Sequence, residues 1–343
     1  MEPRERVLAA LAFQGPDRPP ISHAILPCAQ FHYGDALQRV IDAVPEDFGW
    51  GLLPDQPAEE LPAAYKAGDN RDEWGTLWRV TRQGRFGIPI ECPIAQDWSN
   101  YGAYQWPELG PGTLLDTAVP KYRQYSGQMT GRSDAYYSRG GWLTFFEKLQ
   151  QLHGFEATLE DLATREPMIY RLRDDLLQFN LDWLDRWLAE DYLGLQFADD
   201  WGAQTSMLVS PSMWRSFFKP VYAEMMGKVK KAGRHVWFHS DGYILPIIPD
   251  LIELGVDVLN CQSAVMGLDK LNQFAGHLSF RTDIDRQHVL PFGQPQDVKR
   301  HVHELFEALG TPNGGIVASG ELSFDVPLAN IEAMYEAFLE FKY

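Results

Sequence analysis

The second half of the chain alternates long stretches of helical periodicity with short apolar runs. Pro167 opens a stretch whose apolar residues recur every three or four positions, which predicts an amphipathic helix. These residues are Ile169, Leu172, Leu176, Phe179, Trp183 and Trp187. The following run, residues 192–200, is apolar, has the length of a strand and ends in two aspartates. The pattern therefore predicts a helix followed by a buried strand.

The same cycle repeats to the end of the sequence. Ser210 and Pro211 combine an N-cap residue with a proline at the first helical position, so a helix is expected from there to Gly233. Pro295 and Pro327 open two further helices. Strands are expected at 235–242, 256–262, 277–285 and 314–322. Strand–helix units in such a row predict parallel strands with right-handed crossovers.

The first part of the chain has a different texture. Pro3 can start a helix with an apolar stripe, but from about residue 45 to 140 Pro and Gly are frequent and no helical period persists. We expect irregular strands there. The stretch contains Trp50, Trp74, Trp78, Trp98 and Trp106. Core packing explains most of them, and a minority are expected to form an apolar slot for a planar substrate.

Polar residues follow nearly every predicted strand of the second half. They are Asp199, Asp200, His239, Asp241, Gln262, Asp283, Asp285 and Glu321. In a barrel these strand ends meet at one rim, where such enzymes keep their catalytic residues. Neither a Gly-x-Gly-x-x-Gly motif nor a P-loop follows a strand, which argues against a nucleotide site on an open sheet. We predict an α/β protein, a single-domain TIM (β/α)8 barrel over 1–343, with 45–140 as an excursion over the barrel mouth.

Charge and cysteine content narrow the expected partners. The 343 residues carry 47 acidic and 30 basic side chains, a formal net charge of −17, which repels nucleic-acid phosphates and anionic lipids. Neither nucleic acid nor a membrane is therefore expected as a partner. Cys28, Cys92 and Cys261 are too few and too scattered for a disulfide framework, so a cytoplasmic location is expected. The N-terminus also lacks the pattern of a signal peptide.

His239 and Asp241 are candidate metal ligands. They stand two residues apart on a predicted strand, so they point to the same side, and the turn at Gly242 keeps both at the rim. Glu321, at the end of the last strand, would be a third ligand, leaving one position of a tetrahedral Zn²⁺ open for substrate. The alternative has equal weight: His239 bonds a neighbouring strand and Asp241 caps a helix.

Asp199 and Asp200 are candidate catalytic residues. Adjacent strand residues face opposite sides, so one of the two can face the pocket, as a general acid or base or as a partner of His239. A role as an N-cap and turn acid has equal weight. For Arg281 and Asp283, two residues apart, a structural salt bridge is the favoured role. The candidate substrate contacts are Trp201, Gln204, Gln262, Arg281 and Asp283.

Several segments, in order along the chain, carry a family resemblance. They are RERVLAALAFQGPDRPPI (4–21), DEWGTLW (72–78), FADDWGAQTSMLVSPSMWRSFFKP (197–220), VWFHSDG (236–242), IPDLIELGVDVLNCQ (248–262), LPFGQPQDV (290–298) and IVASGELSFDVP (316–327). Together they resemble the uroporphyrinogen decarboxylase-like superfamily. That resemblance implies a single-domain TIM barrel.

The superfamily has two main activities, and the resemblance favours one of them. Uroporphyrinogen decarboxylases carry arginines after the first strand that meet substrate carboxylates, whereas residues 22–34 here contain no arginine. Cobalamin-dependent methyltransferases bind zinc through His-x-Cys and a later Cys after a glycine. This sequence has His239-x-Asp241 and Gly320-Glu321 at those positions. A harder His/Asp/Glu set resembles the enzymes that demethylate phenyl methyl ethers.

The resemblance implies a zinc-dependent methyltransferase. It would move a methyl group between a small O-methyl compound and the cobalt of a corrinoid that a partner protein carries. Two alternatives remain at this stage: a decarboxylase acting on a substrate other than uroporphyrinogen, and a binding protein on a degenerate barrel.

Overall fold

The structure of the protein is a computed structural model that describes residues 1–49, 61–109 and 133–343. Its main sheet has six strands in the order β10-β9-β8-β7-β6-β5, and every neighbouring pair is parallel. The strands are β5 (Arg139–Leu143), β6 (Gly194–Ala198), β7 (His235–Ser240), β8 (Val258–Cys261), β9 (Ser279–Arg281) and β10 (Ile316–Val317). Because consecutive strands are parallel neighbours, each connection must cross from the carboxyl end of one strand to the amino end of the next.

The N-terminal segment closes this sheet into a barrel. β1 (Ala24–Ile25) pairs in parallel with β11 (Glu321–Leu322), just beyond β10. The Asp47 N–H donates to the Ile21 carbonyl at 3.0 Å, and the Tyr137 N–H donates to the Asp47 carbonyl at 3.0 Å. The backbone at Asp47 therefore lies between the residues that precede β1 and those that lead into β5. The predicted α/β barrel is confirmed.

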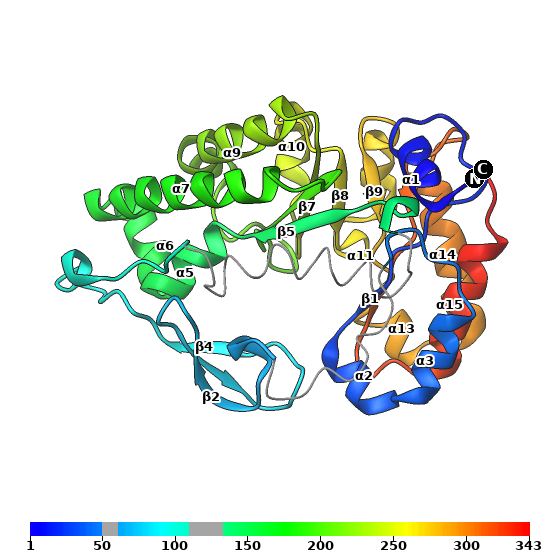
Figure 1. The fold of residues 1–343 in the computed structure, drawn as a ribbon, viewed down its shortest axis with the longest axis horizontal. Helices are drawn as coiled ribbons and strands as arrows, with labels where there is room; N and C mark the ends of the chain where they lie inside the picture. Colours follow the sequence, from blue (N-terminus) through cyan, green and yellow to red (C-terminus); the bar gives the residue numbers. More distant parts are fainter. Residues whose placement is uncertain (50–60, 110–132) are drawn as a thin grey trace.

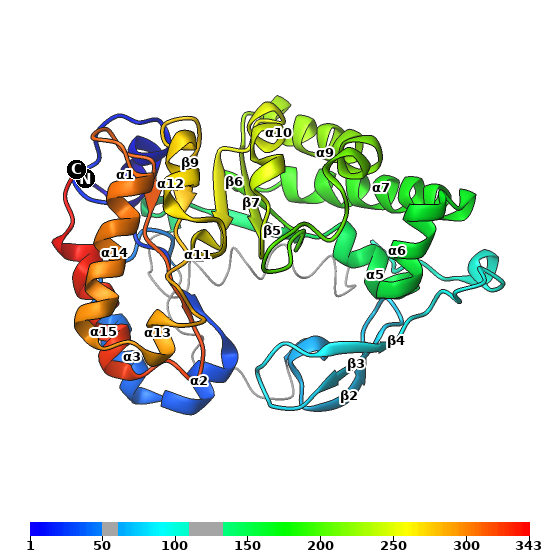
Figure 2. The same cartoon turned by 180° about the vertical axis from the view of Figure 1, so that it is seen from behind.

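Helices cover the outside of the barrel. α5 to α10 lie along one flank and α14 and α15 along the opposite flank (Figure 1 and Figure 2). Within the described residues the helices are α1 (Pro3–Leu11), α2 (Pro27–Tyr33), α3 (Asp35–Asp42), α5 (Phe146–His153), α6 (Phe155–Thr164), α7 (Pro167–Leu188), α8 (Pro211–Met213), α9 (Lys219–Lys231), α10 (Ile248–Glu253), α11 (Ser263–Met266), α12 (Leu268–Leu271), α13 (Val289–Phe292), α14 (Pro295–Leu309) and α15 (Leu328–Glu340). Across the described ranges, no helix combines the length and hydropathy needed to cross a membrane.

Proline starts several of these helices, as the sequence predicts. Pro167, Pro211 and Pro295 are the first residues of α7, α8 and α14, where the missing N–H costs no hydrogen bond. Pro327 instead precedes α15 as its N-cap. A single π-helical turn at Trp214–Phe218 joins α8 to α9.

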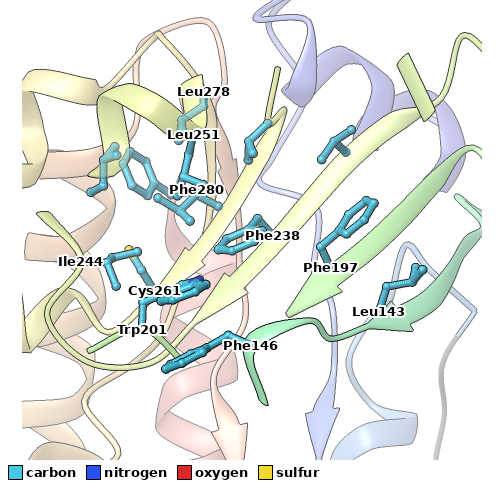
Figure 3. Packing of buried hydrophobic residues seen from close by; sticks show 14 of the residues in the cluster. Leu143, Phe146, Phe197, Trp201, Phe238, Ile244, Leu251, Cys261, Leu278 and Phe280 are labelled. Atoms are coloured by element: carbon cyan, nitrogen blue, oxygen red, sulfur yellow. The ribbon is translucent and has the colours of Figure 1, made fainter. Parts of the chain in front are cut away.

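Alternation along the strands separates two buried layers. Phe197 and Phe238 pack in the large cluster between the strands and the helices (Figure 3). Trp237 points to the opposite side, inside the barrel, and belongs to a second cluster with Phe48 and Tyr137. His239, two residues further along β7, shares the side of Trp237 and therefore stands above this cluster at the barrel mouth.

The loop-rich stretch contains a separate antiparallel sheet formed by β2 (Gly68–Arg71), β3 (Leu77–Val80) and β4 (Ile88–Glu91). Figure 1 shows it set apart from the barrel strands. The Trp74 and Trp106 rings both contact Phe179 of α7, and Trp98 stacks on His153 of α5. Trp74 and Trp78 are buried. Trp74, Trp98 and Trp106 therefore pack against the helices, whereas the Trp78 ring contacts Phe86 and Trp50 lies outside the described residues.

Candidate active site

His239 is held in one orientation by the neighbouring strand. Its register partner on β8 is Asn260, whose Oδ1 lies 2.7 Å from the His239 Nδ1. The Asn260 amide nitrogen donates to the Arg281 carbonyl at 2.9 Å, so its oxygen must face the imidazole. An oxygen can only accept, and therefore His239 carries its proton on Nδ1. The Nε2 atom presents its lone pair to the mouth.

Two carboxylates converge on that Nε2 atom. Asp200 Oδ1 and Asp241 Oδ1 each lie 3.6 Å from it. The backbone N–H of Asp241 donates to Asp200 Oδ1 at 2.9 Å, which fixes the two acids side by side. One ligand atom from each of the three residues falls within 4.8 Å of the others.

A pair of glycines allows the two loops that carry these acids to touch. A Cβ atom on Gly242 would lie 2.0 Å from the Gly202 carbonyl oxygen, far inside van der Waals contact. Gly242 also has a φ of 74°, a left-handed conformation that side chains disfavour. Its N–H donates to Gln262 Oε1 at 2.8 Å. Gln262, a candidate substrate contact, is buried, and this hydrogen bond holds the loop of Asp241 in place.

Arg286 joins the other acids of the mouth. Its Nη1 donates to Glu321 Oε1 at 2.7 Å, and its Nη2 contacts Asp241. Its Nε lies 3.8 Å from Asp283 Oδ2. Glu321, predicted as a metal ligand, is therefore linked to Asp241 through the guanidinium, whereas Asp200 lies directly beside His239. The structure does not test the ligand role of Glu321, which stays a prediction.

The mouth contains more acidic than basic groups, and burial raises the pKa of some of its acids. Burial raises the pKa of Asp283 to about 7, although Arg286 opposes the change. Burial and the Asp200 carboxylate raise the pKa of Glu147 well above its ordinary value. Arg281 is buried, and its Nη1 lies 3.4 Å from Asn260 Oδ1. The partly exposed acids therefore favour a bound cation.

Asp199 and Asp200 have different surroundings. Asp199 is fully buried and accepts hydrogen bonds from the Phe145 and Glu147 N–H groups, each at 2.8 Å, and from the Tyr222 hydroxyl. Burial raises its pKa to about 7. Asp199 thus ties the turn before α5 to β6, and Asp200 is the aspartate that faces His239.

Two further candidate substrate contacts, Trp201 and Gln204, follow Asp200 along the chain. Trp201 is fully buried, and its ring stacks on Phe146 with centroids 4.3 Å apart (Figure 3). Gln204 is exposed on the loop after β6. Trp201 therefore contributes to the core beneath the mouth.

Three residues near the cluster were missed by sequence reasoning: Asn260, Arg286 and Trp142. Asn260 is a polar residue within the apolar run 256–262, and this position indicates a buried side chain that needs a hydrogen-bond partner. Trp142 follows two glycines, a pattern that marks a strand irregularity. Nothing in the sequence singles out Arg286, because two of its partners, Asp241 and Glu321, lie far from it in the chain.

The donor set fits a divalent metal ion. His239 presents a neutral imidazole nitrogen whose other nitrogen already has a partner, as protein metal sites generally require. Two carboxylate oxygens converge on the same point, so three protein ligands are available and further positions stay open. We regard Asp200, His239 and Asp241 as the residues that would hold the ion.

Comparison with known proteins adds family evidence. A family model described as uroporphyrinogen decarboxylase (URO-D) matches residues 146–341. No curated protein matches the chain. Among solved structures, a methyltransferase from Methanosarcina mazei is 13% identical, with a TM-score of 0.70 over 99% of both chains. Dihydropteroate synthase from Xanthomonas albilineans is 10% identical, with a TM-score of 0.31 over 52% of this chain and 59% of that one, too low to bear on the fold.

Proposed function

This chain belongs to the uroporphyrinogen decarboxylase family, and we propose that within this family it is a zinc-dependent methyltransferase. It moves a methyl group between a small O-methyl compound, such as a phenyl methyl ether, and the cobalt of a corrinoid carried by a separate protein. The structure described as a methyltransferase shares the fold over nearly its whole length, which supports this choice within the family. The free cysteines Cys28, Cys92 and Cys261 support a reducing, cytoplasmic setting.

The observation that carries the proposal is the convergence of Asp200 and Asp241 on the lone pair of His239. The lone pair of that nitrogen and the two carboxylate oxygens 3.6 Å away all carry negative charge density, so all three would stabilise a cation placed between them. The chemistry that zinc supplies at such a site is Lewis acidity toward the oxygen of the methyl donor.

The surrounding residues orient the site and hold protons. Asn260 keeps the His239 proton on Nδ1. Burial and the Asp200 carboxylate raise the pKa of Glu147, which makes its carboxyl group the proposed proton donor to the oxygen left after methyl transfer. Arg286 offsets the charges of Glu321 and Asp241 and thus limits repulsion at the mouth.

The contacts of Arg286 argue against decarboxylation of a polycarboxylate. Arg286 already contacts the Asp241 and Glu321 carboxylates, so it offers no free guanidinium to a substrate acid. The segment 22–34 carries no arginine either. A substrate without carboxylates suits these surroundings better.

Zinc binding and methyl transfer test the proposal together. We expect the purified protein to bind about one zinc ion per chain. His239→Gln should lose that ion because it removes the imidazole ligand. His303→Gln, on the exposed face of α14, serves as the matched control and should bind zinc normally. With a panel of methoxy compounds and cob(I)alamin, zinc-loaded wild type should form methylcobalamin, and a chelator should abolish the reaction.

Two outcomes would replace the proposal. Release of carbon dioxide from a carboxylic acid, unaffected by chelation, would identify a decarboxylase. Equal zinc content in wild type and His239→Gln, with no turnover of any compound, would favour a binding protein.

A further inference from the structure

Trp142 is an exposed aromatic side chain beside the candidate metal site. It is 50% exposed, and within the described residues every other tryptophan is buried or partly buried. Its ring centroid lies 5.8 Å from that of His239, with 35° between the two planes. A large apolar surface is therefore left open to solvent at the point where a substrate would approach His239.

A β-bulge directs Trp142 to this position. Arg139 and Gly140 pair in regular order with Gly194 and Leu195 of β6, but the register then shifts before Leu143 pairs with Phe197. Gly141 and Trp142 thus face a single residue of β6. Gly141 has a φ of 77°, which a residue with a side chain adopts only with strain. Bulges of this kind re-aim side chains next to active sites.

The intervening strand leaves room for the two rings. Ala198 of β6 lies between β5 and β7 and is the register partner of His239. Its side chain is a single methyl group, so the Trp142 and His239 rings can approach across it. The bulge, the small residue and the open indole face together form one wall of the mouth.

We propose that Trp142 determines substrate specificity by stacking on a planar ring of the methyl donor, next to His239. This inference rests on the proposed function and names a recognition residue for it. An indole face gains most from a flat aromatic partner, whereas a puckered ring cannot lie parallel to it. Stacking there would place an oxygen substituent of the ring on the side of His239, Asp200 and Asp241.

Binding measurements without a corrinoid test this inference separately from methyl transfer. The probes are anisole and methoxycyclohexane, which share the methoxy group and the ring size but differ in planarity. Isothermal titration of zinc-loaded wild type should show at least about fivefold tighter binding of anisole. Trp142→Leu should raise the anisole Kd about tenfold and leave the methoxycyclohexane Kd unchanged. Trp142→Phe should keep most of the preference. Phe155→Leu, at a similarly exposed aromatic (47%), is the matched control and should have no effect.

The inference fails if wild type binds the two probes equally, or binds neither at millimolar concentration. It also fails if Trp142→Leu leaves the anisole Kd unchanged; weaker binding of methylcobalamin by this variant in a separate titration would then assign the indole to the corrinoid. If Trp142→Leu does not fold, the wild-type preference and the Trp142→Phe variant still decide. Trp142-dependent anisole binding without methyl transfer would overturn the proposed function and leave this recognition site standing.

Discussion

A single amide decides how His239 presents itself to the barrel mouth. Asn260 bonds the Arg281 carbonyl with its nitrogen and the His239 Nδ1 with its oxygen. The tautomer of a metal-binding histidine is generally set by such a partner. Without that partner the imidazole could rotate or shift its proton to the nitrogen that faces the acids.

We therefore predict that Asn260→Ala weakens zinc binding about 10- to 100-fold. Competitive titration against a chromophoric chelator measures the affinity. Asn70→Ala, on the separate sheet of the loop-rich stretch, should leave it unchanged. Equal affinity in both variants and wild type would show that Asn260 does not orient the ligand.

Burial holds a second histidine, His23, in its neutral form. It is buried next to Tyr335, whose hydroxyl lies 2.8 Å from its Nδ1, and burial lowers its pKa from 6.5 to about 4. The unfolded chain binds this proton more readily between those values, so stability should rise with pH from about 4 to about 6.5. The effect should reach up to about 3 kcal/mol.

Unfolding midpoints in urea at pH 5 and pH 7 check this prediction. His23→Gln should reduce the difference between the two pH values, because glutamine does not titrate. His277→Gln, an exposed histidine, is the control. An unchanged pH difference in His23→Gln would contradict the assignment.

At the scale of elements, the site depends on how closely the loops after β6 and β7 approach. Gly202 and Gly242 make this contact, and Asp200 and Asp241 lie beside it. The strands alone align the acids only roughly, since each acid sits beyond the last residue of its strand.

Gly242→Ala should separate these loops. We expect a loss of about 2 kcal/mol or more in the free energy of unfolding, from the clash and from the left-handed backbone, together with weaker zinc binding. Gly227→Ala, on α9 with open space around it, should be neutral or stabilising. Thermal unfolding and zinc titration of both variants measure the effects. Wild-type behaviour of Gly242→Ala would show that the loops can part without cost.

At the scale of the whole molecule, a buried carboxylate ties the N-terminal helix to the barrel. Asp47 is fully buried and accepts from Arg6, from Arg18 and from the Ile21 N–H. Its own backbone links the residues that precede β1 to those that precede β5. The closure of the barrel therefore depends on this ion cluster.

Asp47→Asn should cost about 3–5 kcal/mol, because it removes a buried negative charge that two largely buried arginines share. Asp17→Asn removes a more exposed partner of the same Arg6 and should cost about 1 kcal/mol or less. Denaturant unfolding of the two variants compares them. Equal losses would show that the buried cluster has no special part in closure.

Local patterns in the sequence were sufficient for most of the second half of the fold. The apolar period after Pro167, the helix starts at Pro211 and Pro295, and the strand of residues 235–242 all reappear in the structure. Such signals are read over a few residues and need no distant partner. The strands β1 and β5 were not predicted, because β1 is only two residues long and β5 contains a bulge.

The sequence by itself determined the barrel and the rim on which its acids and His239 gather. The tertiary structure decided which of these groups meet. Asp200 rather than Asp199 faces His239, and Glu321 forms an ion pair with Arg286. A bulge turns Trp142 toward the imidazole. Residue type and period place a side chain on a strand end, but its partners depend on register, on loop approach and on hydrogen bonds between segments far apart in the chain.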